Sequence, residues 1–290
     1  MAAVVASLAL GWCGSPQPAA STGIPVVAGE NFWGSLATQL GGSRVSVTSV
    51  VSDPNADPHE YESSTADARA FADARLVILN GAGYDTWGQK LLDANPSSGR
   101  RILDIAGMLG KKQGDNPHFW YGPDFVTQVA DRITAELEAI DPPGAGYFDR
   151  QRSQLAAAFK PYQDEMTALK SKYSGTPIGS TESVFVYMAQ ALGLNLTTPA
   201  EFMNAVAEGN DPPAAAVARF QDQISNRQIK VLVYNGQTST AVTTNIRSLA
   251  ASRGIPSVGV SETIQPPNLD FQEWQLKQLQ ALEAALGSVS

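Results

Sequence analysis

The chain of 290 residues is poor in the residue types that most often carry chemistry, with one cysteine and two histidines. A single cysteine cannot form an internal disulfide, and no paired-cysteine motif offers a structural zinc site or a redox couple. The motifs of zinc proteases, α/β-hydrolases and phosphate-binding loops are also missing from the sequence. These gaps exclude thiol catalysis and several large enzyme classes.

Basic residues are scarce as well. The chain has 20 Lys and Arg against 28 Asp and Glu, a formal net charge of −8. This acidic balance argues against a nucleic-acid partner and against docking on anionic lipid through a basic patch. With 43% hydrophobic and 17% charged residues, the composition predicts a folded chain with a substantial core, not a disordered one.

Long apolar runs are missing too, and residues 2–12 are too short to span a bilayer. This run resembles the apolar part of a signal peptide, and its end at Cys13 is similar to a bacterial lipoprotein signal, in which the cysteine is lipidated. Trp12 departs from the small residue of that signal, and no Lys or Arg precedes Arg44. We predict export to the extracytoplasmic face of the membrane or the periplasm, with Cys13 as the lipidation site. The alternative is a frayed apolar N-terminus with a buried cysteine.

Short β-branched runs alternate with amphipathic stretches from residue 24 onward, which predicts an α/β fold. Residues 76–80 are almost wholly apolar, as is typical of a strand buried on both faces of a parallel sheet. A long helical stretch over about residues 146–173 separates two alternating halves, and Pro161 should interrupt it. Expected strands are 24–28, 45–51, 76–80, 101–105, 230–234 and 256–260; expected helices are 32–40, 66–74, 124–140, 183–192, 214–224, 243–252 and 271–286.

This alternation divides the chain into four segments. We expect a leader and linker over residues 1–23, an α/β lobe over 24–143, a linking helix over 144–174 and a second α/β lobe over 175–290. Open α/β sheets bind ligands beyond the carboxyl ends of their strands. The cleft between the two lobes is therefore the place to look for a site.

Both histidines lie in the same local setting, directly after a proline. His59 lies in the sequence DPHE and His118 in NPHF. Each loop follows a strand of the first half, and proline stiffens the backbone that presents the histidine. Because these two loops account for every histidine, the pattern favours one shared site over two unrelated loop residues.

Two imidazoles need further ligands to hold a metal ion, and carboxylates of the second half are candidates. Glu182 follows a short strand at the start of a helix, and Glu262 directly follows the strand 256–260. Each has an ordinary interpretation too, Glu182 as a carboxylate at a helix start and Glu262 as a solvated loop residue. Two neutral imidazoles and two carboxylates together would neutralise a divalent cation.

Several motifs resemble those of the metal-specific (zinc/manganese) substrate-binding proteins of bacterial ABC importers, a periplasmic solute-binding protein family. The likeness covers essentially all of residues 24–286. DPHEY at His59 and NPHFWYGP at His118 are similar to the two histidine motifs of the family. TESVFVY at Glu182 is similar to the segment of the third ligand, which is His or Glu in different members. Glu262 stands where the family usually has an aspartate, one methylene shorter.

The resemblance implies two α/β lobes joined by one long helix, with one metal ion held between them by His59, His118, Glu182 and Glu262. It implies a non-enzymatic monomer that carries Mn²⁺ or Zn²⁺ to an ABC transporter permease. A closed cage suits capture, whereas a catalytic zinc keeps a position open for water. Carboxylate ligands and the lack of histidine in residues 107–116 favour manganese, while the intrinsic affinity order favours zinc.

A metal-dependent hydrolase is the alternative interpretation of the same residues. There His59, His118 and Glu182 would bind the metal and Glu262 would act as the general base. Ester turnover that vanishes with Glu262→Gln would favour the enzyme over the carrier. For either site, the sequence predicts that His118→Ala weakens metal binding and leaves the metal-free fold intact, since a loop ligand adds little to core packing.

Overall fold

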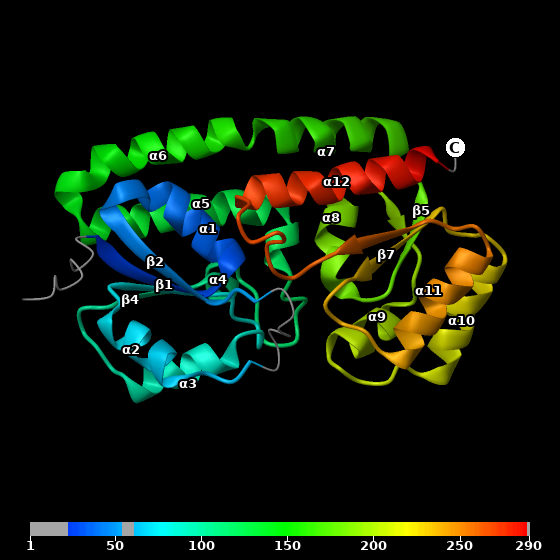
Figure 1. Cartoon of the computed structure of the whole chain (residues 1–290), viewed down its shortest axis with the longest axis horizontal. Coiled ribbons are helices and arrows are strands. Elements are labelled where there is room, and N and C mark those ends of the chain that lie inside the picture. Colours follow the sequence, from blue (N-terminus) through cyan, green and yellow to red (C-terminus); the bar gives the residue numbers. More distant parts are fainter. Residues whose placement is uncertain (1–22, 54–60, 289–290) are drawn as a thin grey trace, which may run out of the picture.

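The computed structural model describes residues 23–53 and 61–288. Figure 1 shows two α/β halves side by side, with long helices running across both of them. Each half contains one four-stranded sheet in which all strands are parallel, in the orders β2-β1-β3-β4 and β6-β5-β7-β8. The predicted fold class, two βα lobes with parallel sheets joined by a helical link, is confirmed.

The strands form where β-branched and apolar residues run together, and the central strands β1, β3, β5 and β7 are mostly buried on both faces. In β1, Val26 and Ala28 belong to the main hydrophobic cluster, whereas Val27 belongs to a second cluster on the other face. The strands are β1 (Ile24–Glu30), β2 (Val45–Val51), β3 (Leu76–Leu79), β4 (Arg101–Asp104), β5 (Pro177–Ser180), β6 (Asn195–Leu196), β7 (Val231–Asn235) and β8 (Ser257–Val260).

Helices cover both faces of each sheet, as double burial requires. In the first half, α1 and α5 lie on one side of the sheet and α2 and α3 on the other (Figure 1). The helices of this half are α1 (Asn31–Gly41), α2 (Thr65–Asp73), α3 (Thr86–Ala94), α4 (Ile105–Met108) and α5 (Pro123–Ile140), with 3₁₀ turns η1 (Gly42–Arg44), η3 (Phe119–Tyr121) and η4 (Pro142–Gly144).

In the second half, α9, α10 and α11 pack on one face of the sheet through the cluster that contains Phe220 and Leu232. The helices of this half are η5 (Ser183–Phe185), α8 (Val186–Ala191), α9 (Ala200–Ala207), α10 (Ala214–Ser225), α11 (Ala241–Ser252) and α12 (Phe271–Gly287). The elements α3, α4, α9 and β6 lie outside the predicted set, and Ile105, predicted as the end of a strand, begins α4. β6 has only two residues, too few for a periodic signal.

The predicted linking helix is divided into α6 (Ala145–Ala158) and α7 (Lys160–Tyr173), with Phe159 between them (Figure 1). Pro161 has no N–H to donate to the carbonyl of Ala157, so the helix cannot continue without a break. The predicted interruption is thus present, two residues before the proline. The lobe boundaries at residues 143 and 174 stay a prediction.

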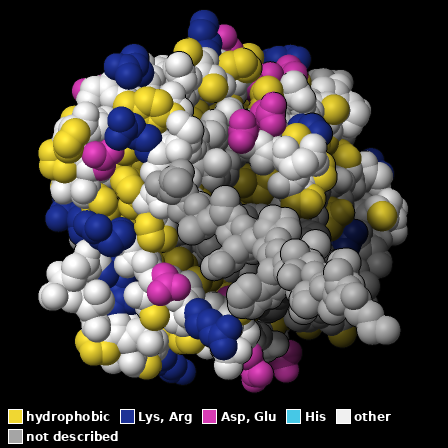
Figure 2. All heavy atoms as spheres, turned by 60° about the vertical axis from the view of Figure 1, so that its left-hand side comes forward, with side chains coloured by type: hydrophobic (Ala, Val, Ile, Leu, Met, Phe, Trp, Pro, Cys, Tyr) yellow, Lys and Arg dark blue, Asp and Glu magenta, His cyan; other side chains and the backbone are white. Residues whose placement is uncertain are grey.

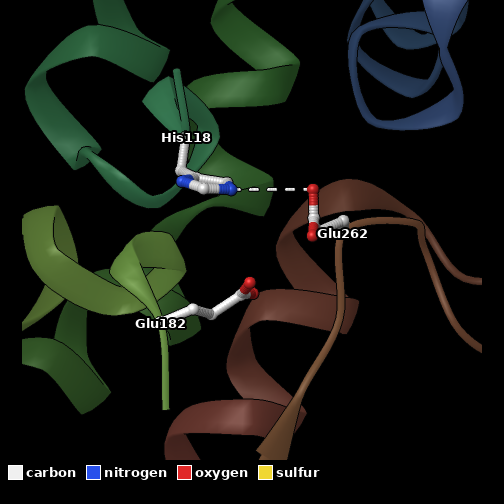
Figure 3. Close-up of side chains that lie close together, drawn as sticks. All are labelled: His118, Glu182 and Glu262. Atoms are coloured by element: carbon white, nitrogen blue, oxygen red, sulfur yellow. Dashed lines mark ion pairs between the residues drawn. The ribbon is translucent and has the colours of Figure 1, made fainter. Parts of the chain in front are cut away.

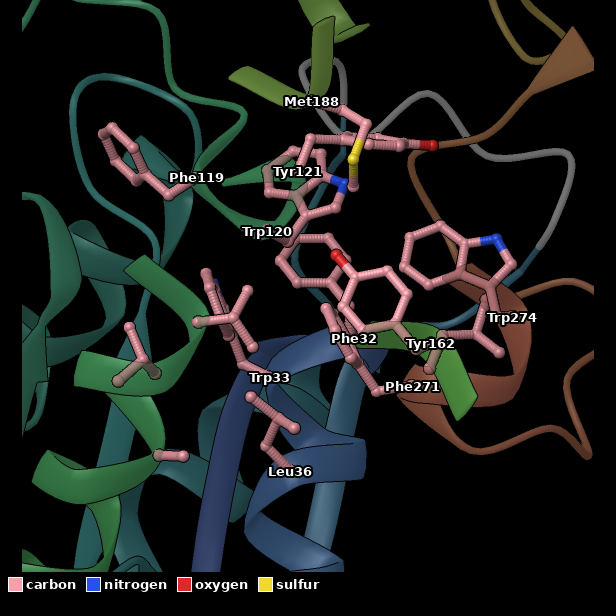
Figure 4. Packing of buried hydrophobic residues seen from close by; sticks show 14 of the residues in the cluster. Phe32, Trp33, Leu36, Phe119, Trp120, Tyr121, Tyr162, Met188, Phe271 and Trp274 are labelled. Atoms are coloured by element: carbon pink, nitrogen blue, oxygen red, sulfur yellow. The ribbon is translucent and has the colours of Figure 1, made fainter. Parts of the chain in front are cut away.

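One hydrophobic cluster extends through both halves. It contains Val26 and Leu76 of the first sheet together with Val231 and Val233 of the second. Its centre is aromatic, and the labelled side chains of Figure 4 are Phe32, Trp33, Leu36, Phe119, Trp120, Tyr121, Tyr162, Met188, Phe271 and Trp274. The two halves therefore share buried side chains through this cluster, in addition to the smaller cluster that each half has on the other face of its sheet.

The final helix ties the second half back to the first. α12 lies along α7 and also contacts α1 (Figure 1). Gln272 and Gln39 exchange side-chain hydrogen bonds of 3.0 and 3.1 Å, and the backbone N–H of Phe271 donates to Ser35 Oγ at 3.0 Å. Within the described residues, no helix is long and apolar enough to cross a membrane.

Candidate metal site

Three of the four predicted ligand residues lie together between the two sheets. His118, Glu182 and Glu262 each offer a ligand atom, and these atoms lie within 4.8 Å of one another. All three side chains are buried, with residue exposures of 0%, 2% and 1%. Figure 3 shows that they come from three separate segments, with His118 Nε2 3.6 Å from Glu262 Oε2. His59 and Cys13 lie outside the described residues.

The strands explain why residues so far apart in sequence meet. Glu182 follows the carboxyl end of β5, Glu262 follows that of β8, and His118 lies in the loop after β4 and α4. Both sheets direct their carboxyl ends toward this site, which is where open α/β sheets place ligands. The sequence order therefore brings together two carboxylates from one half and an imidazole from the other.

The orientation of His118 is set by the residue two positions before it. Its Nδ1 lies 2.6 Å from Asn116 Oδ1, and its backbone N–H donates to the same oxygen at 3.1 Å. Because that amide oxygen only accepts, Nδ1 carries the hydrogen and the lone pair is left on Nε2, the atom that faces Glu262. Metal-binding histidines are commonly held in this way through their other ring nitrogen.

Glu262 is held by polar groups of both halves. Its Oε2 accepts a 2.7 Å hydrogen bond from the Tyr84 hydroxyl, and its Oε1 accepts one of 2.5 Å from Asn235 Nδ2. Its backbone N–H donates to Gln237 Oε1 at 2.5 Å. These contacts fix the carboxylate toward His118. The Glu262 carboxylate is thereby held without exposure to solvent.

The loop that presents Tyr84 has a backbone conformation that favours glycine at position 81. Gly81 has φ of +76°, and a Cβ there would clash with the Asp104 carboxylate. The loop is closed by Asp85, whose carboxylate accepts backbone hydrogen bonds from Asn80 at 2.6 Å and Gly81 at 2.9 Å. The sequence NGAG at residues 80–83 predicts a turn after β3. The structure adds that this loop presents Tyr84 to Glu262.

A buried carboxyl pair lies beneath this loop. Glu30, the last residue of β1, is fully buried, and Asp85 is 3% exposed. Burial raises the pKa of Glu30 well above its ordinary value; the charge of Asp85, a hydrogen bond with Asp85 and the charge of Glu262 raise it further. Burial also raises the pKa of Asp85 to about 6, although backbone N–H groups of Gly81 and Asn80 oppose that shift. Glu30 is therefore the group that holds a proton.

This pair gives an expected pH dependence of stability. A carboxyl whose pKa is higher in the folded state binds protons more tightly there, so its contribution to stability is lost as the pH rises toward the folded pKa. Glu30→Gln supplies a neutral mimic of the protonated group. We expect the metal-free Glu30→Gln protein to lose less unfolding free energy than the natural chain as the pH rises above the ordinary glutamate pKa of 4.5.

Urea unfolding at a series of pH values measures this effect. Glu201→Gln is the matched control, because that residue is exposed and pairs with Arg219 on the surface. An identical decline of unfolding free energy with pH in the natural and Glu30→Gln proteins would mean that Glu30 ionises without penalty.

The burial of His118 corrects one expectation drawn from the sequence. His118 follows a proline in a loop, yet its residue exposure is 0%. Its ring lies 5.2 Å from that of Trp120 and 6.3 Å from that of Tyr84, both in edge contacts. The expectation that a ligand on this loop adds little to packing is therefore wrong, because the loop folds into the aromatic core.

The loop of His118 also bridges the two halves. Asn116 Nδ2 donates to the Ser183 carbonyl at 2.8 Å, and the Tyr187 hydroxyl donates to the Asn116 carbonyl at 2.8 Å. A cavity of about 500 Å³ opens beside His118 between the halves, lined by residues 82–84, 113–118 and part of α9. His118 thus lies beside this opening, while the side chains of all three candidate ligands are shielded from solvent.

Sequence reasoning missed several groups that position the site. Asn235 ends a buried strand, the same signal that marked Glu182, so it could have been found. Asn80, whose Nδ2 donates to the Pro117 carbonyl at 2.9 Å, follows a strand as well. Glu30 gave no separate signal, because a glutamate at the end of a strand is usually solvated. The three candidate ligands, His118, Glu182 and Glu262, together have the donor types of a cation site, one imidazole and two carboxylates.

Comparison with known proteins adds an independent observation. The model of the ZnuA family, described as zinc-uptake complex component A, periplasmic, matches residues 26–285. The manganese-binding lipoprotein MntA of Halalkalibacterium halodurans is 26% identical over 204 residues, which are 66% of this chain and 66% of that protein. The chain thus spans slightly less than two thirds of the length of this relative.

Two further comparisons extend the range of metals. The high-affinity zinc uptake system protein ZnuA of Bacillus subtilis is 21% identical over 251 residues, covering 79% of this chain and 77% of its own. The Cd-bound periplasmic metal binding protein from candidatus liberibacter asiaticus has a similar fold, with a TM-score of 0.75 and 16% identity, covering 90% of this chain and 98% of that one.

Proposed function

Because the chain belongs to the ZnuA family of periplasmic zinc-uptake components, we propose that it captures a divalent transition metal, Mn²⁺ or Zn²⁺, and delivers it to an ABC transporter permease. The observation that carries the proposal is the meeting of His118, Glu182 and Glu262 from two halves of the molecule. Such a family consists of solute-binding proteins, so the prediction that the chain is not an enzyme is confirmed. The hydrolase alternative has no support.

In this proposal the metal is cargo and its ligands are His118 Nε2 and the carboxylates of Glu182 and Glu262. His59, in the second Pro-His loop, is proposed as the fourth ligand on the sequence pattern alone. Two carboxylates balance the charge of a divalent ion in a site with little water. Asn116 and Tyr84 would keep the imidazole and one carboxylate in position for the arriving ion.

The metal itself is proposed as a choice between two ions. Oxygen donors favour Mn²⁺ relative to an all-imidazole site, whereas Zn²⁺ is ahead in intrinsic affinity for most nitrogen and oxygen ligand sets. The names of the relatives point both ways, with manganese for MntA and zinc for ZnuA. We infer one ion per chain in either case.

The location of the protein and its oligomeric state are also proposals, and both follow from membership of the ZnuA family. We infer that the protein acts outside the cytoplasm as a monomer and meets its permease at the membrane. Lipid attachment at Cys13 is proposed from the apolar run that precedes it and from the word lipoprotein in the name of MntA.

Elemental analysis of protein purified without chelator tests the proposal directly. We expect about one manganese or zinc per chain, and competition titration with both ions then ranks them. Glu201→Gln serves as the control, because it removes an exposed carboxylate of the second half and should leave the metal content unchanged. Protein that binds neither ion at saturating concentrations would contradict the proposed function.

A further inference from the structure

A second feature lies at the opposite end of the first half from the metal site. It is a groove of about 380 Å³ between the start of β4 and the last turns of α5. We call it the arginine groove. Its lining includes four arginines, one carboxylate and an exposed isoleucine: Arg75, Arg100, Arg101, Arg132, Glu136 and Ile102.

The charge of this groove is unlike that of the whole chain. Arg101 and Arg132 both pair with Glu136, whose side chain is 4% exposed, while their own side chains remain 45% and 52% exposed. Arg75 is exposed on the same rim. The charged side chains of the lining therefore sum to three positive charges, in a protein whose net charge is −8. The surface of the arginine groove is therefore basic, although the whole chain is acidic.

The floor of the groove is structurally fixed. Arg100 is 8% exposed, and its guanidinium donates to the backbone carbonyls of Phe71, at 2.5 Å, and Asn95. The guanidinium of Arg100 therefore contributes its positive charge from a fixed position in the groove. Any anion that approaches the exposed arginines also meets this fixed charge.

The chain enters the first sheet at the same edge as the groove. The backbone N–H of Arg75 donates to the Pro25 carbonyl at 2.8 Å, and that of Arg101 donates to the Arg75 carbonyl at 2.9 Å. β1 begins at Ile24, so the amino end of this strand lies at the same edge of the sheet as the arginines. Figure 2 shows the molecule turned so that this side comes forward, with Lys and Arg side chains at several places among the coloured atoms.

An apolar side chain completes the surface. Ile102 is 51% exposed and lies in the groove lining among the arginines. Isolated exposed apolar residues are ordinary on proteins. Within a ring of arginines, however, this side chain offers the combination that suits a lipid interface, with cations for headgroups and a short apolar group for the boundary below them.

We propose that the arginine groove docks on the anionic headgroups of a phospholipid membrane, with the amino edge of the first sheet facing the lipid. In this orientation the carboxyl ends of the strands, and the metal site with them, point away from the membrane toward the solution. Docking needs no lipid on Cys13; a lipid there would only raise the local concentration of the groove at the surface.

Vesicle co-sedimentation of the full chain tests the proposal. The probes are vesicles of phosphatidylcholine with and without phosphatidylglycerol. The double variant Arg75→Gln/Arg132→Gln removes two exposed charges and leaves Arg101 to hold Glu136. We expect it to bind the anionic vesicles about 30-fold more weakly than the natural chain, since each basic residue near an anionic surface contributes about fivefold. Added salt should weaken the natural binding.

Matched variants separate docking through the groove from general charge attraction. Arg219→Gln/Arg253→Gln removes two exposed arginines of the second half and should bind vesicles like the natural chain. Equal loss in both double variants, or equal binding of the natural chain to neutral and anionic vesicles, would overturn the proposal. Ile102→Ser should weaken vesicle binding and leave metal binding unchanged. Inorganic phosphate that displaced the vesicles at constant ionic strength would assign the groove to a small soluble anion instead. Unchanged metal binding in every variant keeps this test independent of the proposed function.

Discussion

Replacing His118 by alanine should weaken metal binding more than about 100-fold, because loss of a group that merely supports a metal ligand already costs 10- to 100-fold. The same change should destabilise the metal-free protein by about 3 kcal/mol, since it empties a fully buried aromatic position. Isothermal titration with Mn²⁺ and Zn²⁺ measures the first effect, and urea unfolding of the chelated protein measures the second.

Two further variants keep the two effects of this replacement apart. His118→Gln fills most of the volume and should retain stability while it still loses affinity. Phe71→Ala opens a buried position on the far face of the first sheet and should lose stability while it keeps affinity. Metal binding by His118→Gln equal to that of the natural chain would remove His118 from the proposed ligand set.

Replacing Glu182 by glutamine should change affinity and stability in opposite directions. The Glu182 and Glu262 carboxylates lie within 4.8 Å of each other and are almost fully buried, an arrangement that is unfavourable without a cation. Glutamine removes one negative charge and nearly keeps the shape. We expect metal affinity to fall more than about 100-fold, while the unfolding midpoint of the metal-free protein rises by a few degrees.

Thermal unfolding in the presence of chelator, together with metal titration, checks both signs on one preparation. Glu201→Gln is again the matched control, since it neutralises an exposed carboxylate on the same half. A metal-free protein made less stable by Glu182→Gln would show that the carboxylate is held by favourable contacts, as a structural residue is, and is not stored at a cost for a cation.

Local pattern was sufficient to predict most of the fold. The apolar run at residues 76–80 predicted a doubly buried strand, and β3 is buried throughout. Pro161 predicted an interruption because a proline lacks an N–H whatever surrounds it. Elements failed to be predicted where they are too short to carry a periodic signal, as with the two residues of β6 and the four residues of α4.

The candidate site was predictable only where a residue type was rare or followed a strand. His118 was marked because the chain has two histidines, and Glu182 and Glu262 because they follow strands. The supporting contacts join residues too distant in sequence for any local pattern, such as the 178 positions between Tyr84 and Glu262. The ligand roles of these residues stay a prediction until metal titration tests them.

The burial of His118 and Glu30 shows a different limit of sequence reasoning. A loop histidine and a strand-end glutamate are usually solvated, and composition gives no reason to expect otherwise. Their environment is set by aromatic side chains and by Asp85, which approach only after both sheets and the loop at residues 80–85 have formed. The pKa of Glu30 therefore belongs to the assembled fold and could not be assigned from the residue type.

The hydrophobic cluster that runs through both halves bears on how long an ion would stay bound. Halves that share buried side chains can separate only by exposing apolar area, at about 25 cal/mol for each Å². A wide opening is therefore a rare event, and departure of an ion from the inner end of the cavity has to wait for one. Residence time is then set by protein motion and not by ligand exchange at the metal. Under the proposed function, this shared cluster would make the molecule a carrier that keeps its ion until the halves are forced apart, and not a rapidly exchanging buffer.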